Sequence, residues 1–121
     1  MTGSPEPRTT REVAETYFAA WQARDADTLR SLFADDVTFD GPLASLRGAD
    51  ACVAGLVGMG AILEGLDVRL RLVDGPDVVT WFDLRTTVAE PAPTANWTHV
   101  EDGLVTAVRV AFDPRGVLAA G

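Results

Sequence analysis

Residues 66–112 read LDVRLRLVDGPDVVTWFDLRTTVAEPAPTANWTHVEDGLVTAVRVAF, and apolar and polar side chains alternate through four parts of this stretch. The four parts are residues 68–72, 80–86, 96–101 and 108–112. A period of two is typical of a strand with one buried face, and β-branched and aromatic residues favour strands. We therefore predict four strands in one sheet, with apolar side chains mostly on one face and charges on the other.

Short turn signals separate these strands. Asp74-Gly75 lies between the first two and Asp102-Gly103 between the last two, while a Pro-containing loop at residues 90–94 joins the middle pair. Asp-Gly between alternating apolar residues is a strong hairpin signal, because tight hairpin turns need positive φ. The four strands are thus expected to form an antiparallel meander whose apolar face the N-terminal half must cover.

The N-terminal half carries helix signals. Thr9 and Glu12 fit a capping box at the start of a helix, and the apolar stripe of that helix is Val13, Ala14, Tyr17, Phe18 and Trp21. Asp25 is suited to cap a second, shorter helix. Residues 37–39 form a short extended run, and a third helix is expected from about residues 48–50 to about residue 63. Helices followed by a sheet predict an α+β domain with its helices on one face.

Length and composition limit the possible functions. The chain has 121 residues, enough for one domain, and a net charge of −8, which argues against nucleic acid and anionic membranes as partners. All ten basic residues are Arg, so Schiff-base chemistry is excluded. Cys52 is the single cysteine, which excludes an intramolecular disulfide and a cysteine metal cluster.

The ends of the chain differ in composition from its centre. Residues 1–8 contain two Pro, a Gly and a Ser and are expected to be a flexible leader. The domain is predicted at residues 9–114 and a C-terminal tail at residues 115–121. With no signal-peptide pattern and no apolar run long enough to span a bilayer, a cytoplasmic location is expected.

Three segments together resemble a known family. They are the run LFADDVTF at residues 32–39, Gly48 at a helix start, and EDGLV at residues 101–105 leading to VAFD at residues 110–113. The chain resembles the nuclear transport factor 2-like superfamily, and within it the SnoaL-like branch. The resemblance implies a cone-shaped, curved antiparallel sheet packed against three N-terminal helices around a deep pocket. Since the superfamily includes ketosteroid isomerases, polyketide cyclases, limonene epoxide hydrolases, scytalone dehydratases and non-catalytic modules, the fold leaves the function open.

Three residues are candidates for catalysis. Alternation in residues 96–101 turns Asn96 inward, and the resemblance to ketosteroid isomerases places Tyr17 and Asn96 on that family's two hydrogen-bond donors to the substrate oxygen. The family's catalytic aspartate falls on Gly41, so its neighbour Asp40 is the candidate proton carrier. The alternative is that Asp40 only caps the turn at Gly41-Pro42.

Other inward residues are expected to shape the pocket around a small apolar molecule that carries a carbonyl or hydroxyl group. The predicted ligand-binding residues are Trp21, Phe39, Met59, Phe82, Thr98, Val110 and Phe112. We expect no cofactor and no metal, since neither nucleotide-binding glycine motifs nor clustered metal ligands occur in the sequence.

Two tryptophans are predicted on the outer, charged face of the sheet. Trp81, Trp97 and Arg109 alternate with inward residues, and exposed aromatics on such a face indicate a covered surface. The resemblance implies a homodimer through this face, and the alternative is that a loop or the C-terminal tail at residues 117–120 covers it. His99, the single histidine, is expected on the same face, which favours a surface or interface role over general-base catalysis.

Two functions remain open. The first is a SnoaL-like protein that binds a small apolar molecule, as a cofactor-free isomerase, cyclase or hydrolase if it is an enzyme. The second is a non-catalytic ligand-binding or dimerisation module. The missing aspartate at Gly41 favours the second function, and an inward Asn96 favours the first.

Overall fold

Helix α1 (Thr10–Gln22) begins at the predicted capping box in the computed structural model, which describes residues 8–120. The Thr9 hydroxyl accepts a hydrogen bond from the Glu12 backbone at 3.1 Å, and the Glu12 carboxylate accepts one from the Thr9 backbone at 2.9 Å. Helix α2 (Ala26–Leu32) begins at Asp25, whose carboxylate accepts from the Thr28 backbone at 3.1 Å. Both predicted caps are confirmed, because these side chains satisfy amides that have no partner inside a first turn.

Two further helices follow along the chain. Helix α3 (Ala49–Gly60) is the predicted third helix, ending three residues earlier than expected, and a short α4 (Arg115–Ala120) lies within the predicted C-terminal tail. None of the helices within residues 8–120 is long and apolar enough to cross a membrane. The predicted leader lies outside the described residues except for Arg8, which is exposed.

Six strands form one sheet in the order β2-β1-β6-β5-β4-β3. Their bounds are β1 (Phe33–Asp40), β2 (Ser45–Arg47), β3 (Leu63–Asp74), β4 (Asp77–Thr86), β5 (Ala92–Glu101) and β6 (Leu104–Ala111). The predicted meander is present as β3 to β6, and positive φ at Gly75, Asp102 and Gly103 confirms its two Asp-Gly turns. The sheet as a whole is mixed rather than entirely antiparallel, because β1 lies parallel to β6.

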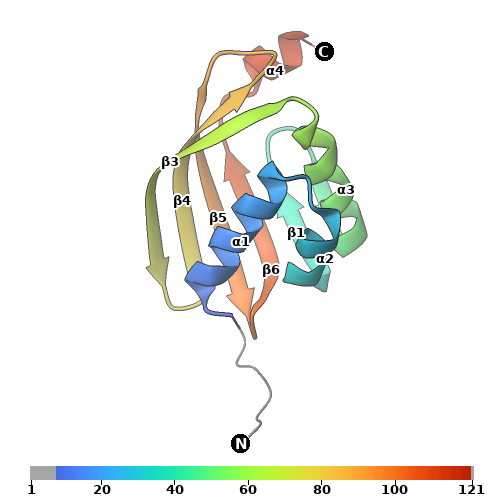
Figure 1. The fold of residues 1–121 in the computed structure, drawn as a ribbon, viewed down its shortest axis with the longest axis vertical. Coiled ribbons are helices and arrows are strands. Elements are labelled where there is room, and N and C mark those ends of the chain that lie inside the picture. Colours follow the sequence, from blue (N-terminus) through green and yellow to red (C-terminus); the bar gives the residue numbers. More distant parts are fainter. Residues whose placement is uncertain (1–7, 121) are drawn as a thin grey trace, which may run out of the picture.

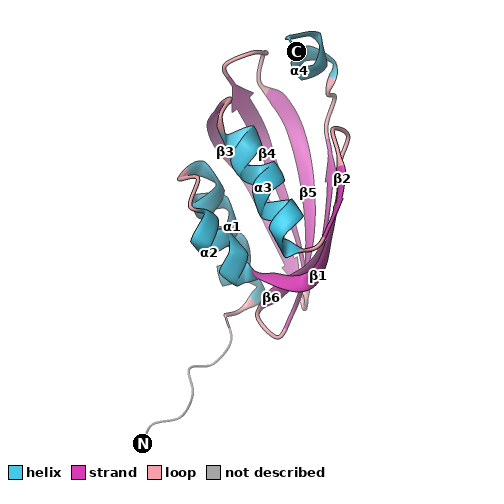
Figure 2. Cartoon of the chain, turned by 90° about the vertical axis from the view of Figure 1, so that its right-hand side faces the viewer, coloured by secondary structure: helices cyan, strands magenta, loops and turns pink. Residues whose placement is uncertain are grey.

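The helices cover the concave face of this curved sheet (Figure 1). Helix α1 crosses the face, α2 and α3 lie beside it over β1, and the convex face carries no helix among the described residues (Figure 2). Tyr17, Phe18 and Trp21 of α1 are buried against the sheet, with Phe18 and Phe82 in edge-to-face contact at 5.3 Å between ring centroids. The predicted α+β class, with helices packed on a curved sheet, is therefore confirmed.

A bulge in β3 changes which side chains face the core. Alternation predicted that Val68, Leu70 and Leu72 point inward, but the pairing of β3 with β4 shifts register between Val68 and Leu70. Leu70 and Leu72 are consequently 51% and 58% exposed, whereas the Arg71 guanidinium lies 5.2 Å from the centroid of the Phe18 ring on the core side. One extra residue in a strand reverses the direction of every side chain after it, so the prediction for Leu70 and Leu72 is wrong. Val68 lies before the bulge and pairs with Phe82, but it is 45% exposed, so it is not buried as predicted either.

Candidate functional site

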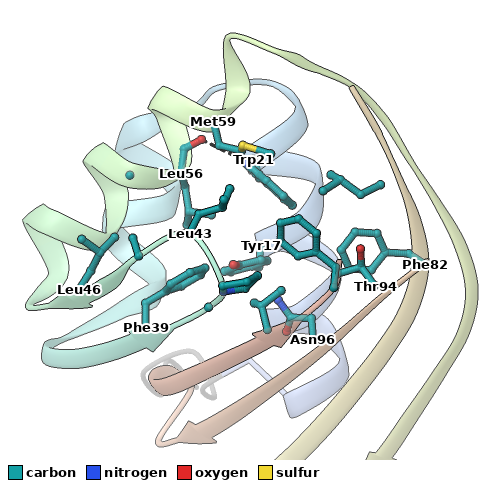
Figure 3. A pocket seen from close by; sticks show the side chains of 17 residues that line it. Tyr17, Trp21, Phe39, Leu43, Leu46, Leu56, Met59, Phe82, Thr94 and Asn96 are labelled. Carbon is teal, nitrogen blue, oxygen red and sulfur yellow. Dashed lines mark hydrogen bonds between the residues drawn. The ribbon is translucent and has the colours of Figure 1, made fainter. Parts of the chain in front are cut away.

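A cavity of about 240 Å³ lies between α1, α3 and the concave face of the sheet (Figure 3). Six of the predicted ligand-binding side chains line it, and they are Trp21, Phe39, Met59, Phe82, Val110 and Phe112. The Trp21 indole donates a hydrogen bond to the Leu56 carbonyl at 2.9 Å, which fixes its ring between α1 and α3. The wall of the cavity is therefore mostly apolar and is held in place by the packing of both helices.

Tyr17 and Asn96 supply polar atoms to this apolar wall. Tyr17 comes from the buried face of α1 and Asn96 from the inward face of β5, and they are 1% and 2% exposed. The Asn96 oxygen accepts a hydrogen bond from the Thr98 hydroxyl at 2.7 Å. The Asn96 nitrogen therefore points toward Tyr17 (Figure 3). Helix and strand thus bring together two donor groups that are far apart in the sequence.

The environment keeps the Tyr17 hydroxyl protonated. Burial strongly raises the pKa of Tyr17, while a hydrogen bond from the Asn96 side chain opposes that rise. The amide nitrogen of Asn96 carries two hydrogens and the Tyr17 hydroxyl carries one, so both side chains can donate. At neutral pH the pair therefore offers uncharged donors to an oxygen in the cavity.

Thr98 does not line the cavity, contrary to its prediction as a ligand-binding residue. It lies two residues after Asn96 on the same face of β5, is 2% exposed and donates to the Asn96 oxygen. The neighbouring amide thus separates its hydroxyl from the cavity. Thr98 therefore orients Asn96 and does not itself line the cavity.

Asp40 also lies outside the cavity, although it was the predicted proton carrier. It lies opposite Arg109 in the pairing of β1 with β6. Its carboxylate accepts a hydrogen bond from Arg47 at 3.1 Å. The Ser45 side chain, with Arg47, holds the pKa of Asp40 below its ordinary value, which weakens it as a base. The next residue, Gly41, lines the cavity instead, because side chains of adjacent residues in an extended strand point to opposite faces.

The sequence prediction missed other lining residues. Leu84 and Thr94 follow the same alternation as Phe82 and Asn96, so the period of two could have identified them. Leu43 and Leu46 come from the β1–β2 loop and from β2, which the sequence did not predict. The other lining residues are Gly41, Pro42, Ala44, Gly55 and Leu56.

Ionisable groups are scarce around the cavity. Tyr17 is the one titratable side chain among the described residues that line it. Within residues 8–120, no three His, Cys, Asp or Glu side chains are grouped to hold a metal ion. The cavity is thus suited to hold an uncharged molecule by shape and hydrogen bonds.

The comparisons agree with this architecture. A protein from Kribbella flavida is 30% identical over 89% of each chain, with a TM-score of 0.83. A nuclear transport factor 2-like protein of unknown function from Cytophaga hutchinsonii is 20% identical over 97% of this chain and 99% of that chain, with a TM-score of 0.82. A ketosteroid isomerase candidate from Kribbella flavida is 23% identical over 86% of this chain and 77% of that chain, with a TM-score of 0.76. The last two likenesses show the fold alone.

The family assignment comes from the sequence itself. No curated protein matches the chain with significance. The model of the family described as the SnoaL-like domain matches residues 14–108, which extend from α1 to β6 and include Tyr17 and Asn96. The protein therefore belongs to the SnoaL-like domain family.

Proposed function

We propose that this protein binds a small, uncharged, mainly apolar molecule through one oxygen atom. The observation that carries the proposal is the Tyr17–Asn96 donor pair in a mostly apolar cavity. A hydrogen bond contributes roughly 0.5–1.5 kcal/mol net, so a carbonyl or hydroxyl oxygen that accepts from Tyr17 and Asn96 is favoured over a molecule without an acceptor. An ionised ligand is disfavoured because the cavity lining contains no Arg, His, Asp or Glu.

The size of the cavity limits the ligand. At roughly 30 Å³ for each water-sized group, a volume of 240 Å³ accommodates on the order of ten non-hydrogen atoms. A monocyclic or short-chain ketone of that size fits, and methyl hexyl ketone is a suitable probe. Burial of its chain supplies affinity at about 25 cal/mol for each Å² of apolar surface, while the donor pair fixes the orientation.

The test is a calorimetric titration of the protein with methyl hexyl ketone. We expect Tyr17→Phe to weaken binding about tenfold, because it removes one hydroxyl donor and leaves the ring in place. Thr106→Val is a matched control, since its hydroxyl donates to the His99 carbonyl away from the cavity lining. Equal affinities for the wild type, Tyr17→Phe and Thr106→Val would contradict the proposal, as would the absence of binding.

The same donor pair favours a second candidate function, a cofactor-free isomerase or cyclase. Donors aimed at a developing oxyanion in a dry site stabilise it strongly. A likeness to the ketosteroid isomerase candidate supports this function at the level of the fold. Enolisation also needs a base. Asp40, the carboxylate next to the lining residue Gly41 in the sequence, is paired with Arg47 outside the cavity. Binding is therefore our first proposal and catalysis the second.

We also propose that the convex face of the sheet joins two copies of the chain. Leu70, Leu72, Val79 and Trp81 are 39–58% exposed there, and strand pairing places Trp97 and Arg109 in the same rows. Beside them, β3 and β4 carry two opposite-charge pairs, Arg69–Asp83 and Arg85–Asp67. Because positive and negative side chains lie side by side on this face, a second copy related by a two-fold axis can place its arginines against the aspartates of the first.

Light scattering after size-exclusion chromatography tests this dimer. The wild type at micromolar concentration should have twice the mass of the chain. Trp81→Glu should be monomeric and folded, because it places a charge within an apolar contact. A monomeric wild type would contradict the dimer and would leave the proposal for the cavity intact.

A further inference from the structure

A second cavity of about 340 Å³ lies at the end of the sheet where β4 and β5 are joined. Its lining comes from the end of β4, the β4–β5 loop, the start of β5 and helix α4. Figures 1 and 2 show α4 beside the β4–β5 loop, at the end of the molecule opposite the N-terminus. We call this the outer compartment, and the cavity that contains Tyr17 and Asn96 the inner compartment.

Leu84 is common to the two compartments. It lines both cavities and is 3% exposed. On the inward face, Phe82 and Thr94 pair in the row that lines the inner compartment, and Leu84 and Ala92 pair in the next row. The compartments are thus consecutive parts of one concave surface, and the Leu84 side chain separates them.

Helix α4 forms one wall of the outer compartment. Gly116 and Val117 of α4 line it, and a Cβ atom added at Gly116 would lie 3.0 Å from the Cβ of Ala89. That distance is shorter than most real Cβ contacts, so a glycine at this position lets α4 pack closely on the β4–β5 loop. In contrast, Leu118 is 61% exposed and does not line the compartment.

The polar groups of the outer compartment select against anions. Glu90 and Asp113 line it, and the hydrogen bonds that Asp113 accepts from Arg115 hold the pKa of Asp113 at about 2. The positive charge of Arg115 offsets that of Asp113, so Glu90, which has no ion pair among the described residues, is the lining carboxylate that would repel a ligand carboxylate. Thr86 also lines the compartment, is 6% exposed, and its hydroxyl has no hydrogen-bond partner among the described residues.

We propose that the two compartments are one elongated site for an uncharged molecule whose oxygen occupies the inner compartment and whose saturated chain passes Leu84 into the outer one. The inference rests on the proposed function, since Tyr17 and Asn96 hold the oxygen. It adds the shape and charge of the ligand: a neutral long-chain ketone or related oxygen compound, and not a fatty acid. A rotamer change of Leu84, whose χ angles have alternative staggered wells, opens the way for the chain.

The test compares methyl hexyl ketone with methyl decyl ketone, which has four more methylene groups, in calorimetric titrations. Each methylene that enters an apolar compartment should raise affinity up to about fourfold. We expect methyl decyl ketone to bind at least tenfold more tightly than methyl hexyl ketone. Lauric acid, a carboxylic acid of similar length, should bind more weakly than methyl decyl ketone at neutral pH.

Substitutions in α4 provide the matched comparison. Val117→Trp places a large ring in the outer compartment and should abolish the advantage of the long ketone, while binding of the short ketone stays unchanged. Leu118→Trp, the next residue of the same helix, is exposed and should change neither affinity.

Each outcome has a distinct meaning. The inference is overturned if the short ketone binds and the long one binds no better, or if Val117→Trp and Leu118→Trp behave alike. In both cases the proposed function remains. If neither ketone binds to the wild type, the proposed function and the elongated site fail together. Tighter binding of lauric acid than of the long ketone would refute the charge selection alone.

Discussion

The hydrogen bond that orients Asn96 should be measurable as a coupling between Asn96 and Thr98. Both side chains are 2% exposed, and the Thr98 hydroxyl donates to the Asn96 oxygen at 2.7 Å. Thr98→Val keeps the shape of the side chain but leaves the amide oxygen in the core without its donor. Asn96→Leu in turn leaves the Thr98 hydroxyl without its acceptor.

Each single substitution should lower the free energy of unfolding by roughly 1–3 kcal/mol, the cost of a buried polar group that loses its partner. The double variant removes both polar groups, and replacing both partners by apolar groups of similar shape is close to neutral. Its loss should therefore be smaller than the sum of the two single losses by about 1–2 kcal/mol. For a chain of 121 residues, a loss of 1 kcal/mol corresponds to a decrease in Tm of roughly 3–6 °C.

The assay is urea unfolding of the wild type, both single variants and the double variant, with titration of methyl hexyl ketone into each. Thr98→Val should also lower the affinity for the ketone several fold, because the Asn96 amide is no longer held with its nitrogen in one direction. Losses that add within about 0.3–0.5 kcal/mol, the range for independent sites, would refute the coupling. Unchanged ketone affinity in Thr98→Val would refute the orienting role.

Three further predictions concern other parts of the molecule. A Cβ atom at Gly41 would make ordinary contacts of 3.5–3.6 Å inside the cavity, so Gly41→Asp should add a base opposite the donor pair. That variant should convert a β,γ-unsaturated cyclic ketone to its conjugated isomer, detected by ultraviolet absorbance, whereas Asp40→Asn should not alter ketone binding. Thr86→Val should raise the free energy of unfolding by about 1 kcal/mol, because it replaces an unpaired buried hydroxyl. The measurement is the midpoint of urea unfolding, which should increase. The hydrogen bond with Asp77 raises the pKa of His99 above 6.5. The stabilisation of the fold by this bond is therefore complete below pH 6.5 and is lost as the pH rises through the raised pKa. His99→Gln should flatten this decline in unfolding measurements from pH about 6 to about 9.

Local signals in the sequence were sufficient for most of the fold. The period of two and the two Asp-Gly turns predicted the meander, and the capping residues Thr9 and Asp25 predicted the start of two helices. The bulge beside Leu70 left no such signal, because the alternation continues through residues 68–72. Its position depends on the register with β4, which is a property of the folded sheet.

The candidate site depended more on tertiary structure. The periodicities of α1 and β5 turned Tyr17 and Asn96 inward, and the structure brings them together. Asp40 was assigned to the pocket through its neighbour Gly41, but adjacent residues of a strand point to opposite faces. The outer compartment could not be predicted, since it exists only where α4 returns to the β4–β5 loop.

The most direct test of the binding site is a crystal structure of the protein with methyl hexyl ketone. We expect the ketone in the inner compartment, with its oxygen about 2.7–3.1 Å from both the Tyr17 hydroxyl and the Asn96 nitrogen. A ketone oxygen directed away from these two groups, or an empty inner compartment at saturating ketone, would contradict it.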